Sequence, residues 1–192
     1  MAVTDVKEKE SYTYADVLSW DEDLRAELVG GELFMMSEPT TAHQAVLGEI
    51  FVQLHRFLRG KPCKVFPAPF GVRLFPKADN SDDTVLEPDI VVVCDRSKLD
   101  ARGCKGAPDL IIEILSPSTA LYDRNTKFKK YLAAGVREYW IVDPEFKQVQ
   151  AFVLDNGRYV ASVYDENDEA PVSVLPGCAI NLADAFSYLG EP

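Results

Sequence analysis

Two short apolar runs in the middle of the chain have the pattern of interior β-strands. Residues 90–93 and 110–115 consist almost entirely of Val, Ile and Leu, and a Pro-Asp pair precedes each run. Unbroken apolar runs of this length suit strands that are covered on both faces of a sheet. The segment that follows, residues 122–134, has apolar positions at helical spacing, and Gly135 is a typical stop after a helix.

The flanking segments show helical and strand-like patterns in turn. Residues 40–59 carry their apolar positions on one helical face, with Thr40 or Thr41 as the N-cap. Residues 25–37 have the pattern of a hairpin around a Gly-Gly turn. We expect residues 95–106 to form a polar connection. Further strands are predicted at 65–75, 85–94, 137–143, 148–154, 158–165 and 171–175, and short helices at 13–20 and 182–188.

These elements predict an α/β fold of the mixed α+β kind, in which a central mixed sheet is flanked by helices. The chain has 192 residues, of which 47% are hydrophobic, and this is enough for one substantial core. We therefore expect a single domain over residues 11–192, preceded by a polar, disordered tail over residues 1–10.

Acidic residues accompany both predicted interior strands. Asp89 opens the first strand and Glu113 lies deep in the second. A buried carboxylate is costly unless a positive charge meets it, and carboxylates on neighbouring strands form a hard oxygen site of the kind that holds Mg²⁺ or Mn²⁺. Lys127, on the following helix, supplies a cation that orients a nucleophile and offsets developing charge. Asp89, Glu113 and Lys127 are therefore the predicted catalytic residues.

The motifs around these residues resemble those of a known family. The chain carries Pro88-Asp89, the run Glu113-Ile-Leu-Ser-Pro-Ser-Thr119, Asp123 with Lys127, and the sequence GVREYWIVDP over residues 135–144. On these motifs it is similar to the Uma-two family of restriction endonucleases, in the PD-(D/E)XK nuclease superfamily. The resemblance implies a restriction endonuclease-like core that hydrolyses DNA with Mg²⁺ or Mn²⁺. Leu115 stands where the superfamily's namesake lysine is expected, and the resemblance implies that the adjacent helix supplies Lys127 instead.

The expected metal ligands are Asp89, Glu113 and the backbone carbonyl of Ile114. Asp109 shares a strand with Glu113 and is four residues away, about 13 Å along the strand, so it is excluded as a ligand of the same ion. Lys130 is an alternative to Lys127.

Further residues are candidates for a supporting role. Glu32, Glu87 and Asp123 are acids that we expect near the metal. His43 lies on the inward face of the first turn of its helix and has two interpretations: a satisfied histidine at the edge of the core, or a group that supports the site. The family resemblance favours the second interpretation as much as the first, because members commonly show a His-Gln pair here.

The net charge of −11 limits how this chain binds DNA. A protein that neutralises phosphates needs a basic face, so tight non-specific binding by a lone acidic subunit is unfavourable. Two subunits related by a two-fold axis would present two sites to two antiparallel strands. We therefore expect a homodimer, formed through the edge that the strands between residues 148 and 164 provide.

Cysteine spacing and hydropathy indicate the compartment. The four cysteines have no CxxC pair, which argues against a zinc site and favours reduced structural thiols. No apolar run approaches the length of a membrane span. We expect a cytoplasmic protein without membrane contact.

The predicted function is that of a metal-dependent endonuclease that hydrolyses DNA phosphodiester bonds. Two alternatives remain: a non-catalytic interaction protein that keeps the nuclease fold, which the acidic charge and Leu115 favour, and a hydrolase of a small phosphodiester.

Overall fold

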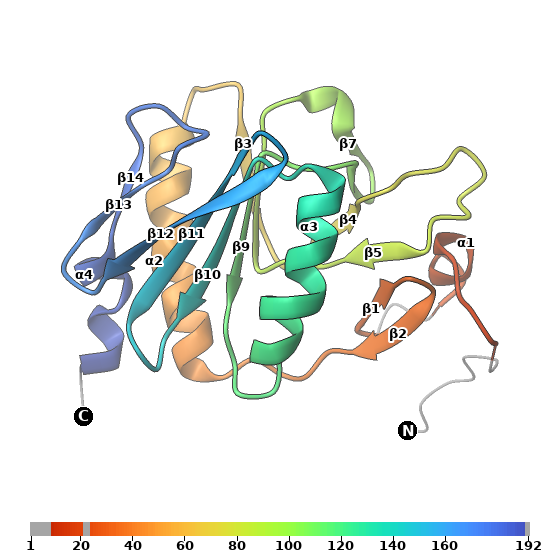
Figure 1. The fold of residues 1–192 in the computed structure, drawn as a ribbon, viewed down its shortest axis with the longest axis horizontal. Coiled ribbons are helices and arrows are strands. Elements are labelled where there is room, and N and C mark those ends of the chain that lie inside the picture. Colours follow the sequence, from red (N-terminus) through yellow and green to blue (C-terminus); the bar gives the residue numbers. More distant parts are fainter. Residues whose placement is uncertain (1–8, 21–23, 191–192) are drawn as a thin grey trace.

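The chain folds into a mixed α/β arrangement in which two mixed sheets contribute to a shared hydrophobic cluster, as a computed structural model describes it for residues 9–20 and 24–190. The predicted fold class is confirmed, although the strands divide between two six-stranded sheets instead of forming one central sheet (Figure 1). Residues 1–8 of the predicted tail lie outside the described residues.

The first sheet has the strand order β2-β1-β5-β4-β8-β7. It is built from β1 (Ala26–Val29), β2 (Glu32–Met35), β4 (Gly71–Arg73), β5 (Thr84–Leu86), β7 (Leu99–Asp100) and β8 (Gly103–Lys105). The predicted hairpin forms β1 and β2. The predicted polar connection at 95–106 contains β7, β8 and a 3-10 turn, η1 (Arg96–Lys98), which are too short to show a period in the sequence.

The second sheet has the order β12-β11-β10-β9-β6-β3. Its strands are β3 (Lys64–Pro67), β6 (Ile90–Val93), β9 (Leu110–Ile114), β10 (Glu138–Asp143), β11 (Gln148–Asp155) and β12 (Arg158–Asp165). Pairing is antiparallel except between β9 and β10.

Two predicted strands each divide between the sheets. The segment 85–94 forms β5 in the first sheet and β6 in the second, and the segment 65–75 forms β3 in the second and β4 in the first. Each break falls at proline, Pro88 in one case and Pro67 with Pro69 in the other. Proline has no amide to donate to a ladder, so the chain leaves one sheet there and enters the other.

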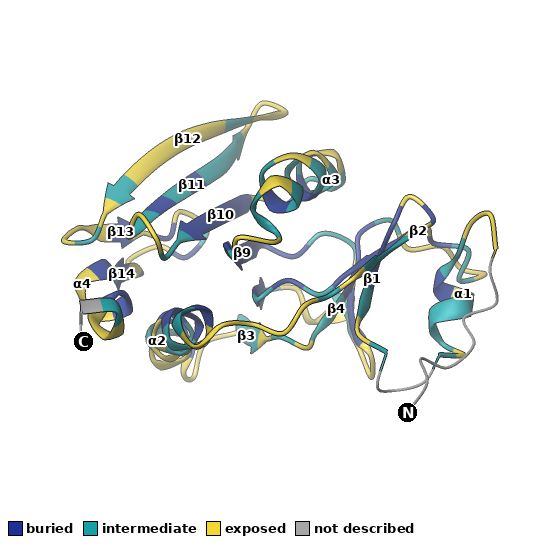
Figure 2. Cartoon of the chain, turned by 90° about the horizontal axis from the view of Figure 1, so that it is seen from below, coloured by how far each residue is buried: buried dark blue, intermediate teal, exposed yellow. Residues whose placement is uncertain are grey.

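Helices cover both faces of the second sheet (Figure 2). The predicted helix at 40–59 is α2 (Thr41–Leu58), which Thr40 caps by accepting from the His43 amide. Its apolar face packs on the alternate strand residues that include Ile90 and Ile112. The helix α3 (Phe128–Ala134) lies on the other face, where Tyr131 packs with Val91 and Ile111 and with residues of the first sheet. Strand alternation therefore decides which side chains face α3.

The remaining elements are short. They are α1 (Tyr14–Val17), β13 (Glu169–Pro171), β14 (Ala179–Asn181), α4 (Leu182–Ala185) and a 3-10 turn, η3 (Ser187–Gly190). The single strand predicted at 171–175 is wrong in its bounds: β13 ends at Pro171 and pairs with β14 in a small separate sheet. No helix in the described part of the chain is long and apolar enough to cross a membrane.

The prediction of reduced cysteines is wrong for one pair. Cys63 and Cys94 form a disulfide, 31 positions apart in the sequence, whereas Cys104 and Cys178 are free and buried. The antiparallel register pairs Lys64 with Val93, so the cysteines just beyond them come face to face. The spacing of the cysteines along the sequence does not predict this contact, because the contact depends on the pairing of β3 with β6.

Candidate active site

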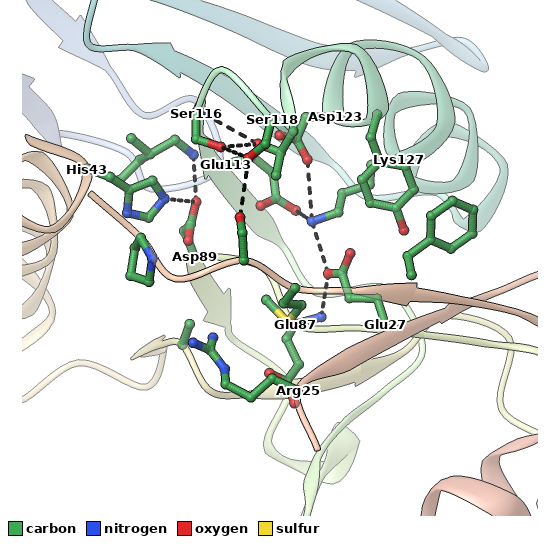
Figure 3. A pocket seen from close by; sticks show the side chains of 18 of the residues that line it. Arg25, Glu27, His43, Glu87, Asp89, Glu113, Ser116, Ser118, Asp123 and Lys127 are labelled. Atoms are coloured by element: carbon green, nitrogen blue, oxygen red, sulfur yellow. Dashed lines mark hydrogen bonds and ion pairs between the residues drawn. The ribbon is translucent and has the colours of Figure 1, made fainter. Parts of the chain in front are cut away.

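A pocket opens where the chain passes between the two sheets. Its cavity of about 520 Å³ is lined by the segment between β5 and β6, by the loop between β3 and β4, by the connection from β2 to α2, and by the turn after β9 (Figure 3). The Pro-Asp motif and the serine-rich motif that follows Glu113 therefore meet at one place. Ser37 and Ser118 contact each other across it, with 3.2 Å between their hydroxyl oxygens.

Glu113 lies on β9, and Asp89 immediately precedes β6, the strand next to β9. The paired residues nearest to them are Ile90 and Ile112, so Asp89 and Glu113 each lie one position beyond the last residues that the ladder pairs at this end. Both carboxylates border the same pocket. Two carboxylates at one pocket are a suitable pair for a hard cation.

Two donors fix the Asp89 carboxylate. Its Oδ2 atom accepts the Ile114 amide at 2.7 Å and lies 3.0 Å from His43 Nε2.

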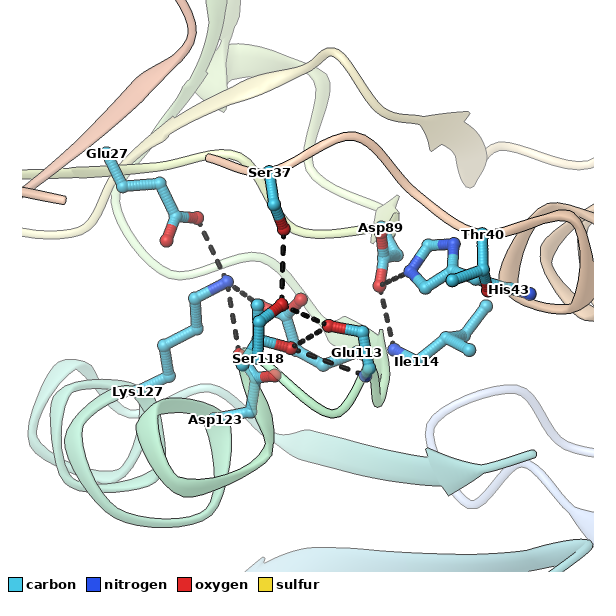
Figure 4. Close-up of polar contacts among 12 residues, drawn as sticks. Glu27, Ser37, Thr40, His43, Asp89, Glu113, Ile114, Ser118, Asp123 and Lys127 are labelled. Atoms are coloured by element: carbon cyan, nitrogen blue, oxygen red, sulfur yellow. Dashed lines mark hydrogen bonds and ion pairs between the residues drawn. The ribbon is translucent and has the colours of Figure 1, made fainter. Parts of the chain in front are cut away.

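Lys127 is buried among three carboxylates. Its Nζ atom lies 2.9 Å from Glu113 Oε1, 3.0 Å from Glu27 Oε1 and 3.4 Å from Asp123 Oδ1 (Figure 4). The hydroxyl of Tyr131 donates to the same Glu113 oxygen at 2.6 Å. The sequence predicted one continuous helix from 122, but residues 122–127 form a π-helical segment, η2 (Tyr122–Lys127), before α3 begins. Such segments are frequent at functional sites.

Burial shapes the ionisation of this cluster. Desolvation raises the pKa of Glu113 well above its ordinary value against the opposing effect of Lys127, and it raises the pKa of Asp123 in the same way. Burial disfavours the Lys127 ammonium, but Glu113, Glu27 and Asp123 outweigh it and raise the lysine pKa well above its ordinary value. The Lys127 ammonium therefore stays charged, whereas the raised pKa values of Glu113 and Asp123 favour their neutral forms.

The structure brings most of the predicted residues together. Asp89, Glu113, Ile114, Lys127, Asp123, Glu87 and His43 all line the pocket. Lys130 does not line it and instead contacts Thr84. His43 is buried and its Nε2 contacts Asp89, but its Nδ1 is buried without a hydrogen-bond partner among the described residues, so the interpretation as a satisfied histidine does not hold.

Glu32 lies outside the pocket, whereas Glu27 lines it. Glu32 lies exposed opposite Val29 at the turn end of the hairpin, whereas Glu27 lies opposite Phe34, nearer the second sheet. Glu27 also accepts the Glu87 amide at 2.9 Å, which ties β1 to the chain crossing. Sequence reasoning missed Glu27, although an acid inside the apolar strand AELV gives the same signal that identified Glu113.

The donor set suits a hard divalent cation. Asp89 Oδ1 and Glu113 Oε2 take part in none of the hydrogen bonds within residues 9–20 and 24–190, and Ile114 lines the same pocket. Across the same residues, no cluster of three His, Cys, Asp or Glu side chains forms a metal site by itself. Two carboxylates, a carbonyl and water are the usual ligands of Mg²⁺, which keeps several of its waters. The residues present fit such an ion.

Comparison with known proteins agrees with this fold. The fold matches a crystal structure from Anabaena variabilis, described as "a putative nuclease belonging to DUF820", with a TM-score of 0.74 and 22% identity over 93% of this chain and 99% of that one. An uncharacterized protein of Synechocystis sp. is 24% identical over 157 residues, which is 80% of each chain. The Uma2 family, described as "Putative restriction endonuclease", matches residues 14–183, and the chain belongs to this family.

Proposed function

We propose that this protein is a metal-dependent endonuclease that hydrolyses DNA phosphodiester bonds with Mg²⁺ or Mn²⁺. The observation that carries the proposal is the pocket that Asp89 and Glu113 share, with the Lys127 ammonium 2.9 Å from Glu113. Membership of the Uma2 family supports the nuclease class.

In this proposal Asp89, Glu113 and the Ile114 carbonyl hold the metal. When bound, the ion polarises the phosphate and lowers the pKa of a water molecule. His43 and the Ile114 amide keep the Asp89 carboxylate in one orientation. Lys127 stands beside the reacting phosphate and offsets the negative charge that develops on it. Glu27 and Asp123 hold the ammonium in place, since each forms an ion pair with it.

The test is cleavage of supercoiled and linear DNA by purified protein with Mn²⁺ or Mg²⁺. We expect Asp89→Asn to lower the rate by about 10²-fold or more, because it removes a charged ligand without removing bulk. Glu32→Gln is the matched control, since Glu32 is an exposed acid outside the pocket, and it should cut at the wild-type rate. Absence of cleavage by the wild type with either metal, or equal cleavage by Asp89→Asn, contradicts the proposal.

A second candidate is an interaction protein that keeps the nuclease fold without catalysis. The net charge of −11 and Leu115 in the position of the family's lysine favour it. Titration with Mn²⁺ in a calorimeter separates the two functions. An endonuclease should bind the ion with a heat that Asp89→Asn abolishes, whereas the interaction protein should show no heat that depends on this carboxylate.

A cleavage assay with a chromogenic phosphodiester tests for a small-molecule hydrolase, for which a cavity of about 520 Å³ has a suitable size.

A further inference from the structure

The pocket has an apolar wall that the proposed chemistry does not use. Met35 is the last residue of β2, Met36 and Pro39 lie in the connection between β2 and α2, and Ala68 and Pro69 lie in the loop between β3 and β4. Met35 is 63% exposed, and Pro39 and Pro69 are also exposed. A large apolar side chain exposed beside a carboxylate site needs an explanation, because such surfaces mark binding sites.

Hydrogen-bond donors lie on the same side as this wall. The Met36 amide bonds to the Arg25 carbonyl at 3.0 Å, so Arg25 and Met36 are neighbours at the open end of the hairpin. The Arg25 guanidinium lies across the pocket from Ser116 and Ser118 (Figure 3). Within the described part of the chain, neither Arg25 nor the exposed Gln44 uses its side chain in a hydrogen bond or ion pair. Burial raises the pKa of Glu87 and the charge of Arg25 opposes that rise, so Arg25 lies near an acid of the pocket. Because it forms no ion pair or side-chain hydrogen bond with the described residues, its guanidinium can contact a phosphate.

A fully paired duplex would make poor contact with this apolar wall. Its base faces are stacked on one another, so only an unpaired or extruded base can lie against an apolar wall. The net charge of −11 also opposes the broad phosphate contact by which proteins hold a duplex. The cavity, about 520 Å³, has the size of a small-ligand site and not of a groove along a helix.

We propose that this pocket takes an unpaired nucleotide of DNA, with the base against Met35, Met36, Pro39 and Pro69 and a neighbouring phosphate on Arg25. The inference rests on the proposed function for the position of the cleaved phosphate, at Asp89 and Glu113. The substrate class is then single-stranded DNA, or a duplex with an unpaired nucleotide.

A binding experiment tests this proposal without requiring that DNA be cleaved. Fluorescence anisotropy follows a labelled oligothymidine and a paired duplex of equal length, with wild-type protein in Ca²⁺. We expect the single strand to bind at least about tenfold more tightly. Met35→Gln/Met36→Gln should weaken its binding by about tenfold, the effect of losing the burial of one apolar side chain. Arg25→Gln should lower the salt dependence of binding by the amount expected for about one phosphate contact, whereas Arg96→Gln, which changes an exposed arginine in η1 outside the pocket, should not. Thermal unfolding confirms that each variant is folded.

The outcomes separate this inference from the proposed function. Tighter binding of the single strand that the methionine variant weakens supports the inference, even if no DNA is cut. Equal binding of both DNAs, or binding that neither variant changes, overturns it, even if duplex DNA is cut through Asp89. An oligouridine that binds more tightly than oligothymidine overturns the assignment to DNA.

Discussion

Lys127 shows how a single buried charge organises this site. Its Nζ atom lies within 3.4 Å of three carboxylates, and its side chain is only 6% exposed. A buried ion pair adds little to stability when compared with apolar packing, but removal of one partner leaves the other charges buried without compensation. Here one ammonium forms ion pairs with Glu27 in the first sheet, Glu113 in the second sheet and Asp123 in η2. The lysine therefore has a structural role in addition to its proposed catalytic one.

We predict that Lys127→Ala lowers the free energy of unfolding by about 3–5 kcal/mol, because the carboxylates lose their counter-ion. Urea unfolding followed by circular dichroism measures the change. The control is Lys129→Ala, which removes an exposed lysine from the same helix and should cost no more than about 0.5 kcal/mol. Equal stability of the two variants would mean that the cluster is not buried in the folded protein.

At the scale of elements, the pairing of β3 with β6 supports the strand that opens the site. β6 leads directly from Asp89, and β3 is its edge neighbour. The disulfide between Cys63 and Cys94 joins the far ends of these two strands. A cross-link that closes a loop of this length stabilises mainly by restricting the unfolded chain.

Reduction of this disulfide should lower the free energy of unfolding by about 2–4 kcal/mol. Urea titrations with and without dithiothreitol provide the measurement. The double variant Cys63→Ser/Cys94→Ser should have the stability of the reduced wild type and should not respond to reductant. A wild-type stability that reductant leaves unchanged would show that the two thiols are not joined in solution.

At the scale of the whole molecule, β12 is an open edge of the second sheet. It is eight residues long, it contains neither proline nor lysine, and its Val160 and Val163 are 56% and 55% exposed. Natural proteins protect such edges against other strands. Antiparallel pairing of two copies brings Arg158 of each beside the Asp165 end of the other, so the charges are complementary. We therefore retain the homodimer as a proposal and assign it to this edge.

Light scattering at micromolar concentration should give twice the monomer mass for the wild type. Val160→Lys should shift the mass to that of a monomer, because a charged edge strand pairs poorly. The matched control is Val52→Lys, which places a lysine at another exposed valine, on α2, and should leave the dimer intact. A monomeric wild type contradicts the prediction, and a dimer that survives Val160→Lys assigns the interface elsewhere.

The sequence by itself determined the elements whose pattern is local. The period of apolar residues predicted α2, the hairpin of β1 and β2, and the strands β9 to β12 with small errors in their bounds. It also identified Asp89, Glu113 and Lys127 as chemically unusual, since a charge in an apolar strand or on the border of a buried helical face is visible without coordinates.

Only the tertiary structure decided which strands are neighbours. Three features depend on residues far apart in the sequence: the division of the strands between two sheets, the pocket that Asp89 shares with Glu113, and the contact of Cys63 with Cys94. The choice of Glu27 over Glu32 depends on the position of the hairpin against the second sheet. Local periodicity specifies which face of a strand is buried, but pairing depends on the burial of whole surfaces at once, and no short window of sequence contains that information.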